Sequence, residues 1–384
     1  MKLRDIRLVR LNAPAHETKT PAKRPSWWEE AEVANPMSRY PKVKRHRNLW
    51  LPKWDSAWCQ VIAEDGTYGL GLVWPLETSR SVIGHLAQHL VGEDCLAIEK
   101  LADMMLRLTK PYGSTGLASY AISAIDLALW DLKGKLLGMP VYSLLGGAQK
   151  DRIYCYCTGN DVDWYQELGF SAFKLACPYG PADGLDGIRR NEAFVAQVRE
   201  QIGDGCELML DCWMAFDVEY AVRLAETLRP YRLKWMEECL IPEDMDGHVA
   251  LRQRLPWQTL ATGEHWYTPV PFEWAIRHQV VDILQPDIGW CGGMTTCRKV
   301  ASAAEAAGMS VILHGGGNTP FGQHFTYATP PSPWCECFVG TPPGVPLEEA
   351  WRLPGQAVPH DGWLVPSDAP GFGLEIPESW LVPA

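Results

Sequence analysis

The sequence predicts an α/β protein in which a parallel β-barrel of the TIM type follows a smaller region of mixed helices and strands. From about residue 150 onward, eight short apolar runs alternate with amphipathic stretches such as 217–229 and 294–307. Runs that are apolar along their whole length are typical of parallel strands covered by helices on both faces. Eight such strands most simply close into a barrel.

The eight runs are each predicted as a strand. In chain order they are I-Y-C-Y-C-T, A-F-K-L-A, E-L-M-L-D, L-K-W-M-E-E, T-L-A-T-G-E, V-V-D-I-L-Q-P-D, S-V-I-L-H and C-E-C-F-V. We place them in a barrel domain at residues 141–340.

Residues 1–140 are predicted to form a separate domain. The start, M-K-L-R-D-I-R-L-V-R-L, alternates charged and aliphatic residues and predicts a strand rather than a signal peptide. W-C-Q-V-I-A and Y-G-L-G-L-V-W, joined by E-D-G-T, predict a hairpin, and aliphatic residues at helical spacing in 121–135 predict a helix. The tail 341–384, rich in Pro and Gly, is expected to fold back onto this domain.

Composition and charge restrict the class of protein. Apolar residues make up 47% of the 384 residues and charged residues 21%, as in an ordinary globular chain. A net charge of −11 argues against a nucleic-acid partner. Because no run approaches the roughly 18 apolar residues of a membrane helix, we expect no membrane partner.

The twelve cysteines are scattered and form no C-x-x-C, so we expect reduced thiols in a cytoplasmic protein. Two close pairs, Cys155/Cys157 and Cys335/Cys337, lie in predicted strands. We expect the two members of each pair to point to opposite faces, which would leave them badly placed to form a bridge or share a metal.

A polar residue lies at or just beyond the C-terminal end of most predicted barrel strands. Any one of these residues could be a helix N-cap or a solvated loop residue. A parallel barrel, however, brings these strand ends to one face, where barrel enzymes place their active sites. The residues are Lys174, Asp211, Glu237, Glu264, Asp287, His314 and Glu336.

Asp211, Glu237 and Glu264 end three successive strands. Three neighbouring carboxylates repel one another and cannot all stay ionised without a cation. A ligand set made only of oxygen atoms suits a hard divalent ion, most simply Mg²⁺, whereas zinc prefers His or Cys.

Asp287 and His314 end the next two strands. A carboxylate beside an imidazole fixes its tautomer and raises its pKa, which makes a general base, although a buried histidine can also be purely structural. A metal opposite such a base is the arrangement that removes a proton from a carbon next to a carboxylate, because the cation stabilises the enediolate.

The run His314-Gly-Gly-Gly also fits the oxyanion-hole loop of an esterase. That interpretation needs a G-x-S-x-G nucleophile elbow, and the nearest run, Y-G-S-T-G at 112–116, lacks the first glycine at the required offset. We instead expect Gly315 to Gly317 to form a strand-end turn that needs positive φ and lets a substrate approach closely.

Several long motifs resemble the enolase superfamily in its mandelate racemase branch. D-L-A-L-W-D-L-K-G-K-L-L-G-M-P-V-Y-S-L-L-G-G (126–147) resembles that branch's junction between capping domain and barrel. L-M-L-D-C-W-M, K-W-M-E-E-C-L, G-E-H and Q-P-D-I-G-W-C-G-G resemble the L-rhamnonate dehydratases of the branch. The likeness runs from P-M-S-R-Y (36–40) to P-G-F-G-L-E (370–375).

The resemblance implies a modified (β/α)₇β barrel with an α+β capping domain made from both termini, one Mg²⁺ per subunit, and a homo-oligomer such as an octamer. The residues that match the family's metal ligands are Asp211, Glu237 and Glu264, with Glu237 rather than Glu238 as the second. His314 with Asp287 matches the acid/base dyad, and Lys174 matches the first lysine of the family's Lys-x-Lys. Glu336 lies where the branch places a carboxyl group that hydrogen-bonds the substrate carboxylate.

The sequence departs from the branch at two positions. Ala176 replaces the second lysine, so the base on that face of the substrate is absent, as it is in the L-rhamnonate dehydratases. Trp27 precedes Trp28 where that family has a histidine before a tryptophan, and it is a candidate substrate contact in the capping segment 12–54. Arg47 aligns with an arginine of the family and is a second candidate contact.

The activity that the resemblance implies is dehydration of a sugar acid, an aldonate, to a 2-keto-3-deoxy acid. His314 would remove the C2 proton, the metal and Lys174 would hold the enediolate, and the C3 hydroxyl would leave, either syn or anti. His265, beside Glu264, is either a second acid or a residue that orients the ligand. Ala176 weighs against an epimerase and says less about a cycloisomerase, while a non-catalytic binding protein would be expected to lose a ligand or the dyad.

Overall fold

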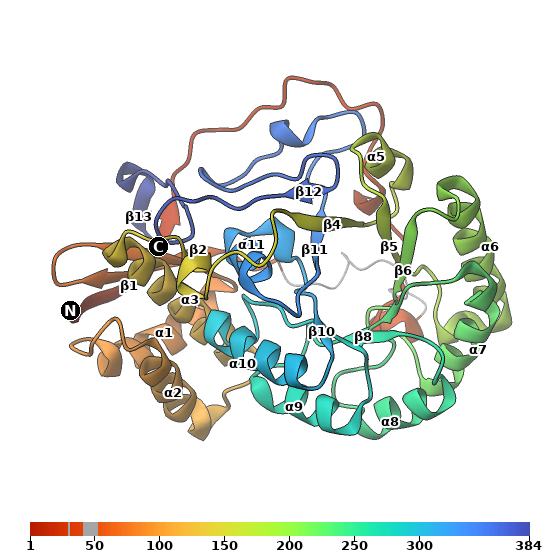
Figure 1. The fold of residues 1–384 in the computed structure, drawn as a ribbon, viewed down its shortest axis with the longest axis horizontal. Coiled ribbons are helices and arrows are strands. Elements are labelled where there is room, and N and C mark those ends of the chain that lie inside the picture. The colour runs from red at the N-terminus through yellow and green to blue at the C-terminus, as the bar shows by residue number, and fades with distance from the viewer. Residues whose placement is uncertain (30, 41–52) are drawn as a thin grey trace.

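The structure is a computed structural model that describes residues 1–29, 31–40 and 53–384 (Figure 1). Arg47 therefore lies outside the described residues. Two sheets organise the chain: an antiparallel sheet of four strands and a parallel sheet that curves into a barrel.

The parallel sheet contains eight strands, and each predicted run contributes one. Neighbouring strands pair in parallel along the path β10-β9-β8-β7-β6-β5-β4-β11. In chain order the strands are β4 (Ile153–Thr158), β5 (Ala172–Ala176), β6 (Glu207–Asp211), β7 (Met236–Glu237), β8 (Leu260–Thr262), β9 (Ile283–Leu284), β10 (Ser310–Val311) and β11 (Trp334–Phe338).

A helix follows each of the first seven strands and covers the outside of the barrel (Figure 1). These helices are α5 (Val162–Glu167), α6 (Gly184–Ile202), α7 (Val218–Leu228), α8 (Met245–Arg254), α9 (Pro269–His278), α10 (Gly293–Ala306) and α11 (Pro320–Ala328). Because the chain continues from β11 into the C-terminal segment instead of an eighth barrel helix, the barrel is (β/α)₇β, as predicted.

The capping region packs three helices against the antiparallel sheet, whose strand order is β13-β1-β2-β3. Its strands are β1 (Leu3–Leu11), β2 (Ala57–Ala63), β3 (Tyr68–Val73) and β13 (Leu381–Pro383), and its helices are α1 (Leu76–Leu90), α2 (Ile98–Thr109) and α3 (Leu117–Leu137). Helix α3 lies so close to β3 that a Cβ on Gly69 or Gly71 would come within 2.0 Å of the carbonyl oxygens of Ala128 and Ala124.

The C-terminal segment contacts both parts of the molecule. Strand β13 pairs antiparallel with β1, and β12 (Trp363–Leu364) pairs antiparallel with barrel strand β4. A short helix, α4 (Val141–Leu144), joins α3 to the barrel. The domain boundaries at residues 140 and 340 remain predictions.

The barrel interior is built in layers because alternate strand residues point inward. One layer is a separate apolar cluster that contains Tyr156, Ala172, Met209, Trp235, Ala261, Ile283 and Ile312. Two residues further along each of these strands come Thr158, Lys174, Asp211, Glu237, Gly263, Gln285 and His314. The predicted polar strand ends are therefore mostly the next inward layer.

The paired cysteines of β4 and β11 correct one expectation. Cys155, Cys157, Cys335 and Cys337 all belong to the outer core cluster, whereas Tyr156 between the first two belongs to the inner one. Residues two apart on a strand share a face, so the members of each C-x-C pair point to the same side. All twelve cysteines of the chain are free thiols in the structure.

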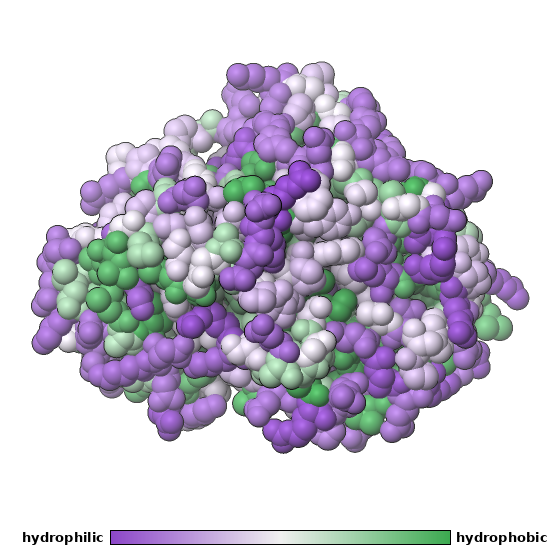
Figure 2. All heavy atoms as spheres, viewed as in Figure 1, coloured by the Kyte–Doolittle hydropathy of each residue, from purple (hydrophilic) through white to green (hydrophobic). Residues whose placement is uncertain are grey.

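On the face seen in Figure 2, hydrophilic residues predominate and apolar residues form separate patches. None of the described helices is both long enough and apolar enough to span a bilayer.

Candidate active site

Lys174 is a fully buried cation held between two carboxylates. Its Nζ forms an ion pair with Glu336 Oε1 at 2.7 Å and also contacts Glu237 Oε1. Burial by itself lowers the pKa of Lys174, but Glu237 and Glu336 outweigh burial and raise this pKa well above its ordinary value. Lys174 is therefore positively charged at neutral pH.

The other oxygen of Glu237 also has partners inside the barrel. Glu237 Oε2 accepts hydrogen bonds from Trp235 Nε1 at 2.9 Å and Gln285 Nε2 at 2.6 Å. Burial raises the pKa of Glu237, Lys174 opposes that rise, and Asp211 adds to it. Keeping the Glu237 carboxylate ionised therefore costs free energy unless positive charge lies nearby.

Asp211 ends β6 and lies at the barrel mouth, where its Oδ1 accepts a hydrogen bond from the backbone N of Trp213 at 2.9 Å. Burial raises the pKa of Asp211, Lys174 opposes the rise, and Glu264 adds to it. Asp211 and Glu264 therefore interact electrostatically across the mouth.

Glu264 also belongs to a tighter group. Glu238, Glu264 and His265 each bring one possible ligand atom to within 4.8 Å of the others. Glu238 has a φ of 44°, unusual for a residue with a side chain, and this turn ends the strict alternation of β7. Its carboxylate consequently reaches His265, just beyond the end of β8, whose Nδ1 lies 2.9 Å from Glu238 Oε1.

His265 and Glu238 form a buried acid/base pair. Burial lowers the pKa of His265, but Glu238 and Glu264 outweigh burial and raise it to about 9. Burial raises the pKa of Glu238, and Glu264 adds to the rise while His265 opposes it. The His265 imidazole is therefore charged at neutral pH in this arrangement.

A second pair, His314 with Asp287, lies beside the first. His314 Nδ1 is 2.7 Å from Asp287 Oδ2, and its Nε2 is 3.6 Å from Glu264 Oε2. The Trp290 ring lies near both imidazoles, with its centroid 5.0 Å from that of His314 and 5.7 Å from that of His265.

The carboxylates around His314 govern its protonation. Burial lowers its pKa, but Glu264, Asp287 and then Glu336 outweigh burial and raise it to about 10. Because Asp287 holds Nδ1, the other ring nitrogen, Nε2, is the one that faces the mouth. A neutral His314 would be a base at Nε2, and a protonated His314 would be an acid at the same atom.

Glu336 ties the glycine loop to the barrel. Its Oε2 accepts a hydrogen bond from Gly315 N at 2.8 Å, and its Oε1 accepts one from Thr158 Oγ1. Burial raises the pKa of Glu336, but Lys174 and His314 outweigh burial and lower it. Glu336 is thus ionised and acts as an acceptor in this structure.

The glycines after His314 serve packing more than substrate access. Gly315 has a φ of +57°, in agreement with the predicted turn. A Cβ on Gly317 would lie 2.3 Å from Cys337 Sγ and 2.7 Å from the Glu336 backbone oxygen. The close approach at Gly317 is therefore to β11, which corrects the expectation that the space serves a substrate.

A cavity of about 520 Å³ lies over these groups. Barrel residues that line it include Asp211, Glu264 and His314, together with Ala176 at the position of the absent lysine. The capping segment closes another side with Trp27 and Trp28, and Trp213 and Trp290 add further aromatic walls. The cavity thus joins the predicted metal side, the predicted base and the predicted contact Trp27.

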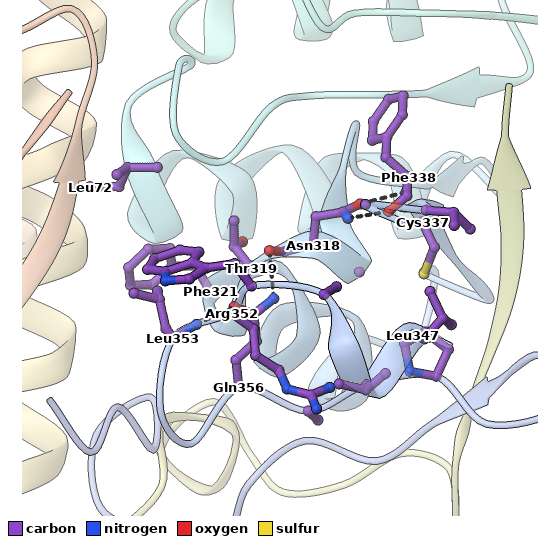
Figure 3. A pocket seen from close by; sticks show the side chains of 18 of the residues that line it. Leu72, Asn318, Thr319, Phe321, Cys337, Phe338, Leu347, Arg352, Leu353 and Gln356 are labelled. Atoms are coloured by element: carbon purple, nitrogen blue, oxygen red, sulfur yellow. Dashed lines mark hydrogen bonds between the residues drawn. The ribbon is translucent and has the colours of Figure 1, made fainter. Parts of the chain in front are cut away.

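A second cavity, of about 390 Å³, lies beside the first and shares Phe338 and Val339 with it (Figure 3). Its polar side chains are paired with backbone: Asn318 Nδ2 and Oδ1 bond to Phe338 O and N, both at 2.8 Å, and Gln356 Nε2 bonds to Asn318 O at 2.8 Å. These pairings favour a packing gap between the capping sheet, α11 and the C-terminal segment over a second polar site.

The donor set fits a divalent cation. Asp211, Glu237, Glu238 and Glu264 are carboxylates at or near the mouth, and burial raises the pKa of the first three. Oxygen ligands in excess of the nearby positive charge suit a hard ion such as Mg²⁺. Glu264 belongs to both the predicted ligand set and the tight group with Glu238 and His265, and the predicted set remains a prediction.

Three contributors to the site, namely Thr158, Gln285 and the pairing of Glu238 with His265, are not among the residues predicted from the sequence. Thr158 and Gln285 follow Tyr156 and Ile283 by two residues, so strand alternation places them inward. That signal is readable once the register of each strand is known. No local pattern reveals the reach of Glu238 to His265, because it depends on the turn at Glu238.

Two family models match the chain. The mandelate racemase / muconate lactonizing enzyme N-terminal domain matches residues 57–146, and the enolase C-terminal domain-like model matches residues 160–380. The chain belongs to the enolase superfamily, in its mandelate racemase branch.

Members of this superfamily resemble the chain over nearly its whole length. L-rhamnonate dehydratase of Saccharopolyspora erythraea is 38% identical over 98% of this chain and 97% of its own. The structure of rhamnonate dehydratase from Gibberella zeae complexed with Mg is 31% identical with a TM-score of 0.90, covering 100% of this chain and 96% of that one. The 3,6-anhydro-D-galactonate cycloisomerase of Zobellia galactanivorans is 25% identical with a TM-score of 0.76, covering 100% of both chains.

Proposed function

We propose that this member of the superfamily is a Mg²⁺-dependent sugar acid dehydratase, a hydro-lyase acting on L-rhamnonate or a closely related aldonate. It removes the C2 proton and eliminates the C3 hydroxyl, and the product is a 2-keto-3-deoxy acid. The observation that carries the proposal is the His314–Asp287 pair, whose Nε2 lies 3.6 Å from Glu264 Oε2 at the edge of a cavity that Ala176, at the position of a second base, also lines. The names of the relatives support the same substrate class.

Mg²⁺ would be held by Asp211, Glu237 and Glu264 at the ends of three adjacent strands. When bound, the ion would supply the positive charge that stabilises the enediolate into which the substrate carboxylate is converted when C2 loses its proton. Glu237 would need to share its carboxylate between this role and Lys174, which it contacts now.

His314 is the proposed general base. It must be neutral to accept the C2 proton, and Glu264 is the carboxylate that raises its pKa most strongly. A cation bound to Glu264 would offset its negative charge. The pKa of His314 would then fall from about 10 toward neutral pH, where the imidazole can be a base. Asp287 keeps the proton on Nδ1, so that Nε2 is the atom that takes the C2 proton.

Lys174 and Glu336 stand on the proposed carboxylate side of the substrate. The charged Lys174 ammonium is available to hold the enediolate as negative charge develops. Glu336 is ionised in this structure and would donate a hydrogen bond to the substrate carboxylate only after taking up a proton. Its present contacts hold Lys174 and Gly315 in place.

The leaving hydroxyl needs an acid because hydroxide is a poor leaving group. Protonated His314 can supply that proton in a syn elimination. His265 is the alternative, since its Nδ1 pairs with Glu238, which raises its pKa and favours the protonated form. General acid help of roughly 10²- to 10⁴-fold is expected from either residue.

Two further expectations go with the proposal. Arg47 is proposed as a substrate contact from the capping segment, and Trp27 as another. Assembly into a homo-oligomer such as an octamer is proposed from the family resemblance, and a cytoplasmic location from the free thiols.

A screen of aldonates, aldarates and 6-deoxyaldonates with the purified protein and Mg²⁺ tests the proposal, with semicarbazide to detect 2-keto acids. We expect turnover of L-rhamnonate, L-mannonate or L-lyxonate, and loss of turnover in His314→Asn. Failure of every library member to yield a keto acid would contradict dehydration.

The same incubation in D₂O then distinguishes the alternatives. Deuterium at C2 without dehydration indicates an epimerase or a cycloisomerase, for which the similarity to the Zobellia galactanivorans enzyme gives a precedent. No exchange with any library member indicates a binding protein on the same barrel.

A further inference from the structure

We propose that Asp161, outside the cavity, is a positioning residue that fixes Trp27 as one wall of the substrate site. The inference concerns how the site is formed, and its link to substrate affinity rests on the proposed function. Asp161 follows β4 and immediately precedes α5, whereas Trp27 belongs to the capping segment, 134 residues earlier.

The Asp161 carboxylate is buried, with 3% of the residue exposed, and it bonds only toward the capping segment among the side-chain contacts described. Its Oδ1 accepts from Arg24 Nη1, and its Oδ2 accepts from Ser26 Oγ at 3.0 Å and from the backbone N of Trp27 at 2.9 Å. A carboxylate that gathers three donors from one short segment holds the backbone of that segment in a single place.

The guanidinium of Arg24 bridges two carboxylates. Its Nη2 donates to Asp163 Oδ1 at 2.6 Å, while its Nη1 donates to Asp161. Asp163 is exposed and contacts no backbone of the capping segment in the bonds described, so it shares the charge of Arg24 without holding Trp27. This difference makes Asp163 a matched control for Asp161.

The side chain of Trp27 is fixed as well as its backbone. Its indole lies against the end of β4, where a Cβ on Gly159 would come within 2.4 Å of Trp27 Nε1. The same Cβ would come within 2.2 Å of the hydroxyl oxygen of Tyr165, a residue of α5. The Trp27 indole and the Tyr165 hydroxyl therefore both pack against Gly159, which holds the Trp27 ring as a wall of the cavity.

This arrangement separates the binding of a substrate from the chemistry. Asp161 has no contact with His314, Asp287 or the carboxylates of the mouth in the bonds described, so its loss should leave the proton-transfer groups in place. A loosened Trp27 wall must instead be ordered when substrate binds, and this ordering weakens affinity. The expected signature is a rise in KM with little change in kcat.

The first test is hydrogen exchange of the full-length protein, followed by mass spectrometry on peptides that cover residues 26–29. In wild type the Trp27 amide is bonded to Asp161 and should exchange slowly. We expect Asp161→Asn to speed exchange of this peptide about tenfold and Asp163→Asn to leave it within twofold. Equal uptake in wild type and Asp161→Asn would overturn the proposal.

The second test is steady-state kinetics with the aldonate found in the screen. Asp161→Asn should raise KM about tenfold with kcat within twofold, whereas Asp163→Asn should change neither by more than twofold. A fall in kcat at unchanged KM would also overturn the proposal, because it would place Asp161 in the chemistry. If Asp161→Asn does not fold, Ser26→Ala and Arg24→Gln remove two of the three bonds from the capping side and leave only the bond from the Trp27 backbone N.

The two tests separate the inference from the proposed function. If wild type turns over no aldonate, the proposed function fails, and the exchange experiment still decides whether Asp161 fixes Trp27. If wild type is active and exchange at residues 26–29 is unchanged in Asp161→Asn, only the positioning role fails.

Discussion

Two histidines ten residues apart in the chain, one partly exposed at the cavity and one fully buried, are placed in different electrostatic environments. His314 lies at the barrel mouth, where Glu264 and Asp287 outweigh burial and raise its pKa to about 10. His324 lies in α11, against Tyr142 of α4 and Phe372, and burial lowers its pKa to about 3. Burial lowers both pKa values; at His314 Glu264 and Asp287 outweigh burial, whereas at His324 the single carboxylate Asp368 does not.

The largest effect is expected when the His314 imidazole at the barrel mouth is removed. His314→Asn should lower kcat by about 10²- to 10⁴-fold, since an amide cannot accept or return the C2 proton. The measurement is keto acid formation with semicarbazide on the substrate of the wild-type protein. Thermal unfolding of the variant should stay within a few degrees of wild type, and retention of a tenth of the activity would remove His314 from the chemistry.

The next largest effect is expected from the buried cation of the mouth. Lys174→Met leaves Glu237 and Glu336 without their shared partner and should lower the free energy of unfolding by about 3–5 kcal/mol. Lys100→Met, which removes an exposed ion pair with Glu93, is the matched control and should cost at most about 1 kcal/mol. Chemical denaturation measures both, and equal losses would contradict the assignment of Lys174 as a buried counter-ion.

Metal binding should stabilise the mouth because it neutralises the crowded carboxylates. After treatment with EDTA, adding Mg²⁺ to about 100 times its Kd should raise the free energy of unfolding by about 2.7 kcal/mol. The same ionic strength of NaCl serves as the control. Glu264→Gln should abolish this gain, and a gain that survives in the variant would show that Mg²⁺ binds elsewhere.

The smallest effect concerns His324 and the pH dependence of stability. Its folded pKa of about 3 lies below the unfolded value of about 6.5, so the unfolded chain binds the extra proton between these values. The stabilising contribution is therefore complete above about pH 6.5 and is lost as the pH falls toward 3. Between pH 7 and pH 5 the loss should be about 2 kcal/mol.

His324→Gln removes the titrating group while keeping a polar side chain that can face the backbone N of Tyr142, which now donates to His324 Nδ1 at 3.2 Å. Unfolding in denaturant at pH 7 and pH 5, with Mg²⁺ saturating throughout, should show a pH dependence smaller by about 2 kcal/mol in the variant. Parallel curves for the two proteins would show that His324 does not bind the extra proton on unfolding.

The strands of the barrel were readable from local pattern because a parallel strand buried on both faces must be apolar throughout. Their polar ends were readable for the same reason: Lys174 and His314 stand out in runs that are otherwise mostly apolar. The register within each run, which decides which residues point into the barrel, was harder to predict from the sequence. This register places Thr158 and Gln285 in the inward layer. The error at Cys155 and Cys157 was of this kind, since residues two apart share a face.

The partners of these side chains depended on contacts between distant segments. No local pattern predicts that Glu238 bonds His265, because a turn with φ of 44° ends the alternation of its strand. The predicted metal ligand Glu237 bonds Lys174 of β5 and Gln285, which directly follows β9. Both partners are far from Glu237 in the chain. Likewise, the sequence marked Trp27 as a substrate contact but gave no sign that Asp161 and Tyr165 hold it.

The sequence by itself determined the barrel, the order of its strands and the chemical type of the groups at its mouth, because period, composition and strand-end polarity are local properties. Only the tertiary structure decided which of those groups are charged, which are paired and which face the cavity. The physical reason is that pKa values and hydrogen bonds depend on distances between residues far apart in the chain. His314 and His324 carry the same side chain, and their pKa values differ because of what the fold brings beside them.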